Sequence, residues 1–89
     1  MTKKRRKLNK DFEKKIYNSK KNVELVLAKI YDIDDEDIQK EYVSAFNGVV
    51  FLYERLKEDY DQKGFSDNSE EFFSNYKNAY NLFESEFEI

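Results

Sequence analysis

Apolar residues recur along most of this chain at spacings of three and four, the period of one face of an α-helix. Three segments carry the pattern, and they predict helices over residues 9–32, 34–63 and 67–87. Short connections make successive helices antiparallel, so the sequence predicts an all-α antiparallel three-helix bundle. The stripes expected to form its core are Phe12, Ile16, Ser19, Val23, Val26, Ile30 and Ile33; Tyr42, Ala45, Phe46, Val49, Leu52, Tyr53, Leu56 and Tyr60; and Phe73, Tyr76, Tyr80, Phe83 and Phe87.

The first predicted helix contains one weak segment. Residues 18–22 read Asn-Ser-Lys-Lys-Asn, and Asn and Ser have low helix propensity. A break at this segment would give four helices instead of three, and the sequence leaves that alternative open.

Polar residues mark where the first two helices are expected to begin. Asn9 is the predicted N-cap of the first helix and Asp34 that of the second, since both side chains accept hydrogen bonds from free backbone N–H groups. With Asp34 as the cap, Ile33 and Ile38 are expected to pack against each other as a hydrophobic staple.

The connection between the second and third helices has its own signals. Gly64 is expected to end the second helix in a left-handed conformation, with Phe65 closing a Schellman motif against the last turn. Ser66 or Asp67 is the predicted cap of the third helix, with Glu70 completing a capping box from Asp67.

Charge is distributed unevenly, although the formal net charge of the 89 residues is only −3. Residues 1–22 carry ten Lys or Arg and two acids, whereas residues 23–89 carry six Lys or Arg and seventeen acids. We divide the chain into a basic N-terminal arm, residues 1–8, and a helical domain, residues 9–89. An asymmetry of this kind indicates an electrostatic partner or self-association.

The residue types exclude most catalytic chemistry. The chain has no His and no Cys, and its two glycines form no phosphate-binding loop, so we expect neither an enzyme nor a bound cofactor. The acidic run from Asp32 invites a calcium loop, but Asp37 stands where Gly is needed and Val43 where a bidentate Glu is needed. We therefore expect no metal site.

The expected location and source follow from composition. No apolar segment approaches the roughly 20 residues that cross a bilayer, and none follows the basic terminus as in a signal peptide. We therefore expect a cytoplasmic protein with no membrane partner. Thirteen Lys against three Arg, with abundant Asn, Ile, Tyr and Phe, suggest AT-rich codons, and hence a low-GC bacterium or one of its phages or mobile elements.

The leading functional hypothesis concerns acidic residues at one end of the bundle. In an up-down-up arrangement the first connection and the end of the third helix share an end, which we call the acidic pole. Clustered carboxylates without cations mimic nucleic acid and attract cationic surfaces. We expect a small regulatory or inhibitory protein that binds nucleic-acid-handling machinery through this pole. Its residues are Asp32, Asp34, Asp35, Glu36, Asp37, Glu84, Glu86 and Glu88.

Three alternatives remain open. The arm and one side of the first helix could bind nucleic acid directly, through Lys3, Lys4, Arg5, Arg6, Lys7, Lys10, Lys14 and Lys21. The chain could form a homo-oligomer in which the arm of one copy docks on the acidic body of the next. A partner could also dock on apolar residues that fall off the core stripes, namely Tyr31, Val50, Phe51 and Phe72.

Overall fold

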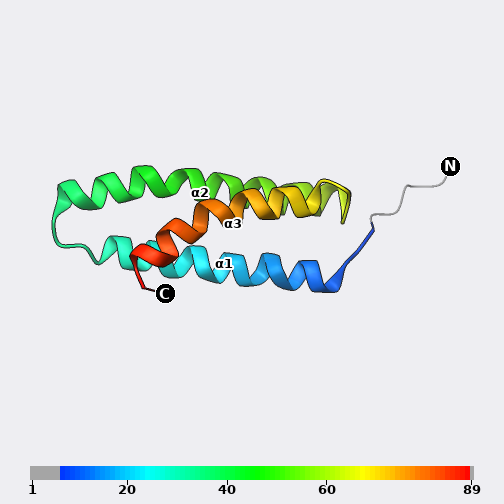
Figure 1. Ribbon diagram of the computed structural model, residues 1–89, viewed down its shortest axis with the longest axis horizontal. Helices are drawn as coiled ribbons and strands as arrows, with labels where there is room; N and C mark the ends of the chain where they lie inside the picture. The colour runs from blue at the N-terminus through cyan, green and yellow to red at the C-terminus, as the bar shows by residue number, and fades with distance from the viewer. Residues whose placement is uncertain (1–6, 89) are drawn as a thin grey trace.

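The computed structural model describes residues 7–88, which form three antiparallel helices (Figure 1). They are α1 (Lys10–Tyr31), α2 (Glu36–Lys63) and α3 (Ser69–Glu86). The chain runs up, down and up again, so the α1–α2 connection and the end of α3 lie toward the same end of the molecule (Figure 1). The all-α three-helix bundle predicted from the sequence is therefore confirmed.

Helix α1 runs without a break through residues 18–22, so the four-helix alternative is wrong. Ser19 lies in the core stripe of α1 and is almost fully buried. Its hydroxyl donates to the carbonyl of Lys15 at 2.8 Å, which satisfies the polar group within its own helix. The buried hydroxyl is therefore not left without a partner, and the core stripe of α1 can include Ser19.

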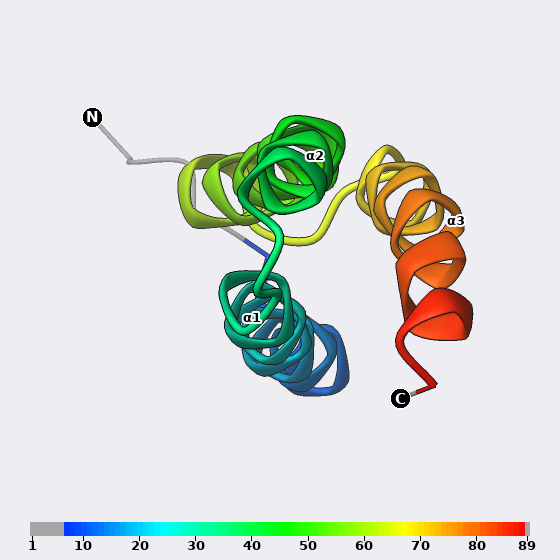
Figure 2. The ribbon, with the colours of Figure 1, turned by 90° about the vertical axis from the view of Figure 1, so that its left-hand side faces the viewer.

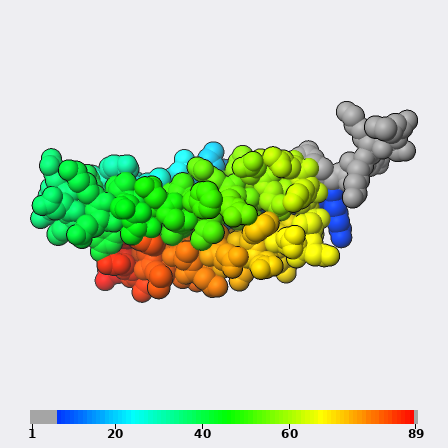
Figure 3. Space-filling model, turned by 90° about the horizontal axis from the view of Figure 1, so that it is seen from above, coloured from blue at the N-terminus to red at the C-terminus, as the bar shows by residue number. Residues whose placement is uncertain are grey.

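The core follows the predicted stripes except at Ala45, which is exposed, and Ile33, which is only half-buried. Helix α2 packs against both of its neighbours, and the shorter α3 lies beside it without reaching the α1–α2 connection (Figures 2 and 3). Aromatic rings set the register between α2 and α3, with centroids 4.9 Å apart for Phe46–Phe83 and 6.0 Å for Tyr53–Tyr76. The buried apolar side chains are Phe12, Ile16, Val23, Val26, Ile30, Phe46, Val49, Tyr53, Leu56, Tyr60, Tyr76 and Tyr80.

Helix α3 meets α1 through aromatic side chains, among them Phe73, whose ring centroid lies 6.1 Å from that of Phe12. Tyr76 and Tyr80 are both fully buried and stack with their ring centroids 5.8 Å apart. The hydroxyl of Tyr76 donates to the backbone carbonyl of Ser19 in α1 at 3.4 Å. Large aromatic side chains thus join two helices whose backbones make few direct contacts.

The start of α1 is as predicted, but that of α2 is not. Asn9 caps α1, accepting from a backbone N–H of the first turn at 3.0 Å. The cap of α2 is Asp35 rather than Asp34, and it accepts from two backbone N–H groups at 2.9 and 3.1 Å. The staple predicted for Ile33 and Ile38 fails with it, since Asp34 and Gln39 now hold the staple positions.

The reason for this shift lies in the connection itself. The side-chain amide of Gln39 donates to the carbonyls of Tyr31 and Ile33, at 3.1 and 3.2 Å. These bonds satisfy carbonyls that the end of α1 leaves free. They also tie the first turn of α2 to the end of α1, and Asp35 is then the residue that meets the exposed N–H groups of α2.

The end of α2 differs from the predicted Schellman motif. Gly64 has a positive φ of 73°, as expected, but its ψ of −161° is not that of a left-handed helix. The N–H of Phe65 donates to the carbonyl of Lys7 at 2.6 Å instead of folding back onto α2. The incoming N-terminal segment supplies that acceptor, and a β-bridge joins Lys7 to Gly64.

The predicted cap of α3 is also wrong. Helix α3 begins after Asn68, whose side chain makes no capping bond. Inside the preceding turn the N–H of Ser66 donates to the hydroxyl of Ser69 at 2.9 Å, and the N–H of Ser69 donates to the carbonyl of Ser66 at 3.0 Å. Because Ser69 is buried and bonded to Ser66, the turn is closed from within and neither Ser66 nor Asp67 caps the helix.

Candidate functional site

The acidic pole is built around the α1–α2 connection. Its five carboxylates in that region, Asp32, Asp34, Asp35, Glu36 and Asp37, are all solvent-exposed. The positive end of the α2 dipole favours acids in its first turn, and the capping role of Asp35 explains one of them. Asp32 and Asp34 precede the helix, so its first turn does not account for them.

None of these five carboxylates forms an ion pair within residues 7–88. The ion pairs of this part of the chain lie toward the other end of α2, at 3.1 Å for Lys57–Asp61 and 3.4 Å for Lys63–Asp59. The negative charge at the α1–α2 connection is therefore left uncompensated by any cation in direct contact.

Helix α3 brings its acidic end to the same side of the molecule but not to the tip. The hydroxyl of Tyr42 donates to the carboxylate of Glu86. Tyr42 lies six residues after Glu36 along α2, about 9 Å from the connection. The bond to Glu86, more than burial, raises the pKa of the Tyr42 hydroxyl, because the proton that the hydroxyl would lose is the one it donates to the carboxylate. Glu84 is half-buried and Glu88 is exposed.

The pole is consequently a spread anionic surface and not a chelating cluster. Within residues 7–88, no three acidic side chains are grouped closely enough to hold a metal ion. Such a surface can attract an extended cationic partner, whereas it has no geometry suited to a single small cation.

Two exposed apolar side chains lie among these carboxylates. Tyr31 ends α1 with 62% of its surface exposed, and Ile38 in the first turn of α2 is 45% exposed. Sequence reasoning assigned Ile38 to a staple, and its surface position follows only from the shifted start of α2. The pole therefore offers apolar contact area as well as charge.

A second charged surface covers the outer side of α1. Lys10, Lys14 and Lys21 are exposed and share one side of the helix, as their spacing predicts. Tyr17 lies on the same side, is 56% exposed, and has the Lys21 ammonium 4.7 Å from its ring centroid. Sequence reasoning missed Tyr17, although its spacing of three and four residues from two of these lysines could have revealed it.

The arm is only partly described by the structure. Lys3, Lys4, Arg5 and Arg6 lie outside the described residues. Lys7 is fixed to the body of the protein through its carbonyl, and its ammonium lies 5.9 Å from the centre of the Phe65 ring.

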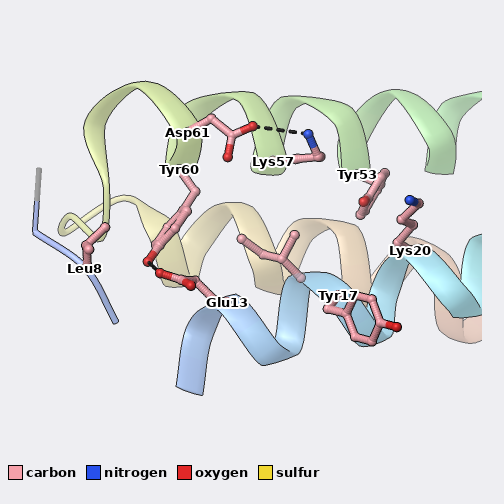
Figure 4. A pocket seen from close by; sticks show the side chains of 9 residues that line it. Leu8, Glu13, Tyr17, Lys20, Tyr53, Lys57, Tyr60 and Asp61 are labelled. Atoms are coloured by element: carbon pink, nitrogen blue, oxygen red, sulfur yellow. Dashed lines mark hydrogen bonds and ion pairs between the residues drawn. The ribbon is translucent and has the colours of Figure 1, made fainter. Parts of the chain in front are cut away.

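A groove of about 520 Å³ lies between α1 and α2 (Figure 4). At one end the hydroxyl of Tyr60 donates to the carboxylate of Glu13 at 2.5 Å, and nearby Lys57 pairs with Asp61. The first of these bonds joins α2 to α1 across the groove, whereas the ion pair lies along α2. Sequence reasoning missed the groove because its walls come from separate helices. Its lining is Leu8, Glu13, Ile16, Tyr17, Lys20, Tyr53, Lys57, Tyr60 and Asp61.

The predicted aromatic patch is divided by the fold. Val50 and Phe72 are half-buried and Phe51 is 58% exposed, close together on α2 and α3. The Arg55 guanidinium joins the two phenyl rings, lying 5.9 Å from Phe51 and 5.7 Å from Phe72. Tyr31 is separate from this patch. Its carbonyl accepts from the side chain of Gln39, which precedes Phe51 on α2 by twelve positions, about 18 Å.

Comparison with known proteins identifies no relative. No helix within residues 7–88 is long and apolar enough to cross a membrane. No protein-family model matches the chain, and no curated protein or solved structure is significantly similar to it.

Proposed function

We propose that this chain is a small non-enzymatic binding protein that regulates or inhibits a nucleic-acid-processing protein. It docks the acidic pole on a cationic surface of that partner. The observation that carries the proposal is the set of five exposed carboxylates at the α1–α2 connection with no ion pair within residues 7–88. A surface that holds phosphates is cationic, and unpaired carboxylates are complementary to it.

The apolar residues at the pole support a specific contact in place of mere charge attraction. Tyr31 and Ile38 are large and exposed between the carboxylates. Tyrosine is enriched among the residues that dominate binding energy at interfaces. In this scheme the carboxylates speed the encounter, and the burial of Tyr31 and Ile38 slows dissociation. The coding bias inferred from composition supports the further proposal that this inhibitor belongs to a phage or other mobile element of a low-GC bacterium.

The test neutralises pole carboxylates that cap no helix. The variant combines Asp32→Asn, Asp34→Asn and Glu36→Gln, and it leaves the capping Asp35 in place. Immobilised wild-type chain is exposed to nuclease-treated lysate of a low-GC bacterium and eluted with duplex DNA. We expect nucleic-acid-binding proteins to be retained and then displaced by the DNA, and the pole variant to lose them.

A matched control separates the pole from overall charge. Glu24→Gln, Glu54→Gln and Asp67→Asn alter three exposed acids elsewhere, so both triple variants raise the formal net charge from −3 to zero. The control should retain the same proteins as the wild type, and thermal melting should show both variants folded. Equal retention by the pole variant and the wild type would refute the proposal.

Direct nucleic-acid binding is a second candidate, and one observation favours it. Tyr17 lies in line with the exposed lysines of α1, and an aromatic ring beside cations is a platform on which single-stranded bases stack. Anisotropy of a labelled single-stranded oligonucleotide at low salt tests this candidate. Tyr17→Ala and Lys14→Gln should each weaken binding, the latter lowering the salt slope by about one. No binding by the full chain would eliminate the candidate.

A further inference from the structure

The outer face of α2 is unlike the rest of the surface. Although 39% of the chain is charged, the twelve residues 42–53 in the middle of α2 include no charged side chain. Neither α1 nor α3 covers this side of α2 (Figures 2 and 3). The exposed residues there include Ser44, Asn47, Gly48 and Phe51, which stand at positions i, i+3, i+4 and i+7 and so share one face.

Phe51 is a large apolar side chain at the centre of this face. It is 58% exposed, and its ring centroid lies 5.9 Å from the Arg55 guanidinium, which is also 5.7 Å from the ring centroid of Phe72. Arg55 is exposed and forms no ion pair within residues 7–88, since the neighbouring Asp59 is bound to Lys63. A guanidinium held by two rings is preorganised to bind a carboxylate.

Gly48 serves no evident purpose in the single chain. It lies inside α2, where glycine weakens a helix relative to alanine, and a Cβ atom built on it would meet nothing within 4 Å. Among the described glycines only Gly64 has a positive φ, so the backbone does not require glycine at 48 either. Without a side chain at 48, the helix backbone between Ser44 and Phe51 is open to close approach by another chain.

The charges that flank the neutral segment would pair with opposite charges on a second α2 running in the opposite direction. Lys40 and Glu41 precede it, and Arg55 and Glu58 follow it, all four exposed. A second α2 running antiparallel, with a two-fold axis near Gly48, would place Arg55 opposite Glu41 and Lys40 opposite Glu58. In both pairs the two residues would lie at the same level along the helix axis to within about one residue's rise, 1.5 Å. In a parallel pair of α2 helices, each charged residue would instead face the same residue of the other copy, and like charges would repel.

We propose that this face binds a second copy of the chain, giving an antiparallel two-fold homodimer. Phe51 of each copy packs over the side-chain-free backbone at Gly48 of the other, beside Ser44 and Asn47, in the manner of a knob packing between the side chains of a facing helix. Two Arg55–Glu41 pairs and two Lys40–Glu58 pairs flank the contact, because a two-fold interface repeats every interaction. The acidic poles lie at opposite ends of the dimer and remain accessible to other partners.

The mass of the full chain in solution tests the dimer. Sedimentation equilibrium from low-micromolar to high-micromolar concentration should show reversible dimerisation, since one helix face is a small interface. Phe51→Glu should raise the dissociation constant about tenfold or more. Leu25→Glu, a matched change at an exposed apolar residue of α1, should leave it unaltered. A wild-type chain that stays monomeric throughout would overturn the proposal.

A charge exchange tests the predicted register. Arg55→Glu should weaken the dimer by placing two carboxylates together, and adding Glu41→Arg should restore it. The second substitution would not restore dimerisation if residues 41 and 55 did not face each other across the interface. Failure of the double variant to recover, while circular dichroism shows it folded, would refute the register.

Cross-linking tests the direction, because the chain has no native cysteine. Gly48→Cys lies near the two-fold axis, so mild oxidation should yield a disulfide-linked dimer. Asp37→Cys lies eleven residues away, so its two copies would be about 33 Å apart and should stay unlinked. Efficient linkage of the Asp37→Cys variant would indicate a parallel pair and contradict the proposal.

Discussion

Removal of the Tyr80 hydroxyl is expected to stabilise the protein, although substitutions of core residues usually destabilise it. The Tyr80 side chain is fully buried, and its hydroxyl oxygen has no hydrogen-bond partner within residues 7–88. Burial also raises the pKa of this hydroxyl, which agrees with a site that solvates the oxygen poorly. Tyr80→Phe deletes that oxygen and retains the ring, which stacks on Tyr76.

The magnitude follows from the cost of an unsatisfied polar group. A buried hydroxyl without a partner costs about 1–3 kcal/mol relative to one exposed to water. Part of this gain is offset by the small void that the oxygen leaves. We therefore expect Tyr80→Phe to raise the free energy of unfolding by about 1 kcal/mol.

Tyr76→Phe is the matched control, since Tyr76 is one turn away on α3 and equally buried. Its hydroxyl does have a partner, the carbonyl of Ser19 at 3.4 Å. Loss of that long bond should lower the free energy of unfolding by about 0.5–1.5 kcal/mol. The two substitutions remove the same atom, so opposite signs would isolate the hydrogen bond as the cause.

Urea unfolding followed by far-UV circular dichroism measures both effects. The slope of the free energy against urea should be equal in the wild type and both variants, because the surface exposed on unfolding is unchanged. A loss of 1 kcal/mol or more in Tyr80→Phe would refute the reasoning, because it would mean that the hydroxyl is bonded in solution.

Three further outcomes are expected. Burial raises the pKa of Tyr76 to about 12. Between pH 10 and 12 the folded chain therefore keeps a proton that the unfolded chain has released. The free energy of unfolding should fall by about 2–3 kcal/mol over that range. Tyr76→Phe should flatten that fall in a pH series of urea titrations. Asp35→Ala should lower the free energy of unfolding by about 1 kcal/mol, because α2 loses its N-cap. Asp34→Ala should change it by less than about 0.5 kcal/mol. Equal effects of the two substitutions would contradict the assignment of Asp35 as the N-cap. Gly64→Ala should destabilise the protein by about 1 kcal/mol because of its positive φ, whereas thermal melting at low protein concentration should show Gly48→Ala to be stabilising by a similar amount.

The fold was predictable because the signals for it are local and repeated. Each helix is marked by several apolar residues at spacings of three and four, so a single misplaced residue such as Ser19 does not erase the pattern. Short connections then leave antiparallel packing as the natural arrangement. The buried set agrees with these stripes because burial of apolar area dominates the stability of the bundle.

The helix ends were less predictable because segments distant in the sequence compete for the same backbone groups. Asn9 caps α1 through a bond three residues away, and the sequence identified it correctly. Phe65 bonds to the carbonyl of Lys7, and Gln39 reaches back to the end of α1. Local rules cannot weigh such acceptors, since their distance from the donor is known only once the helices have packed.

The candidate surfaces divide in the same way. The sequence alone determined that charge is segregated, that His and Cys chemistry is absent and that acids accumulate between the first two helices, because these are properties of residue identity and order. Only the tertiary structure decided that Tyr31 is remote from Phe51, that Arg55 contacts the rings of both Phe51 and Phe72, and that the neutral face of α2 is uncovered. A helix has many sides, and the sequence specifies which residues share a side. Which side remains exposed depends on the packing of all three helices together.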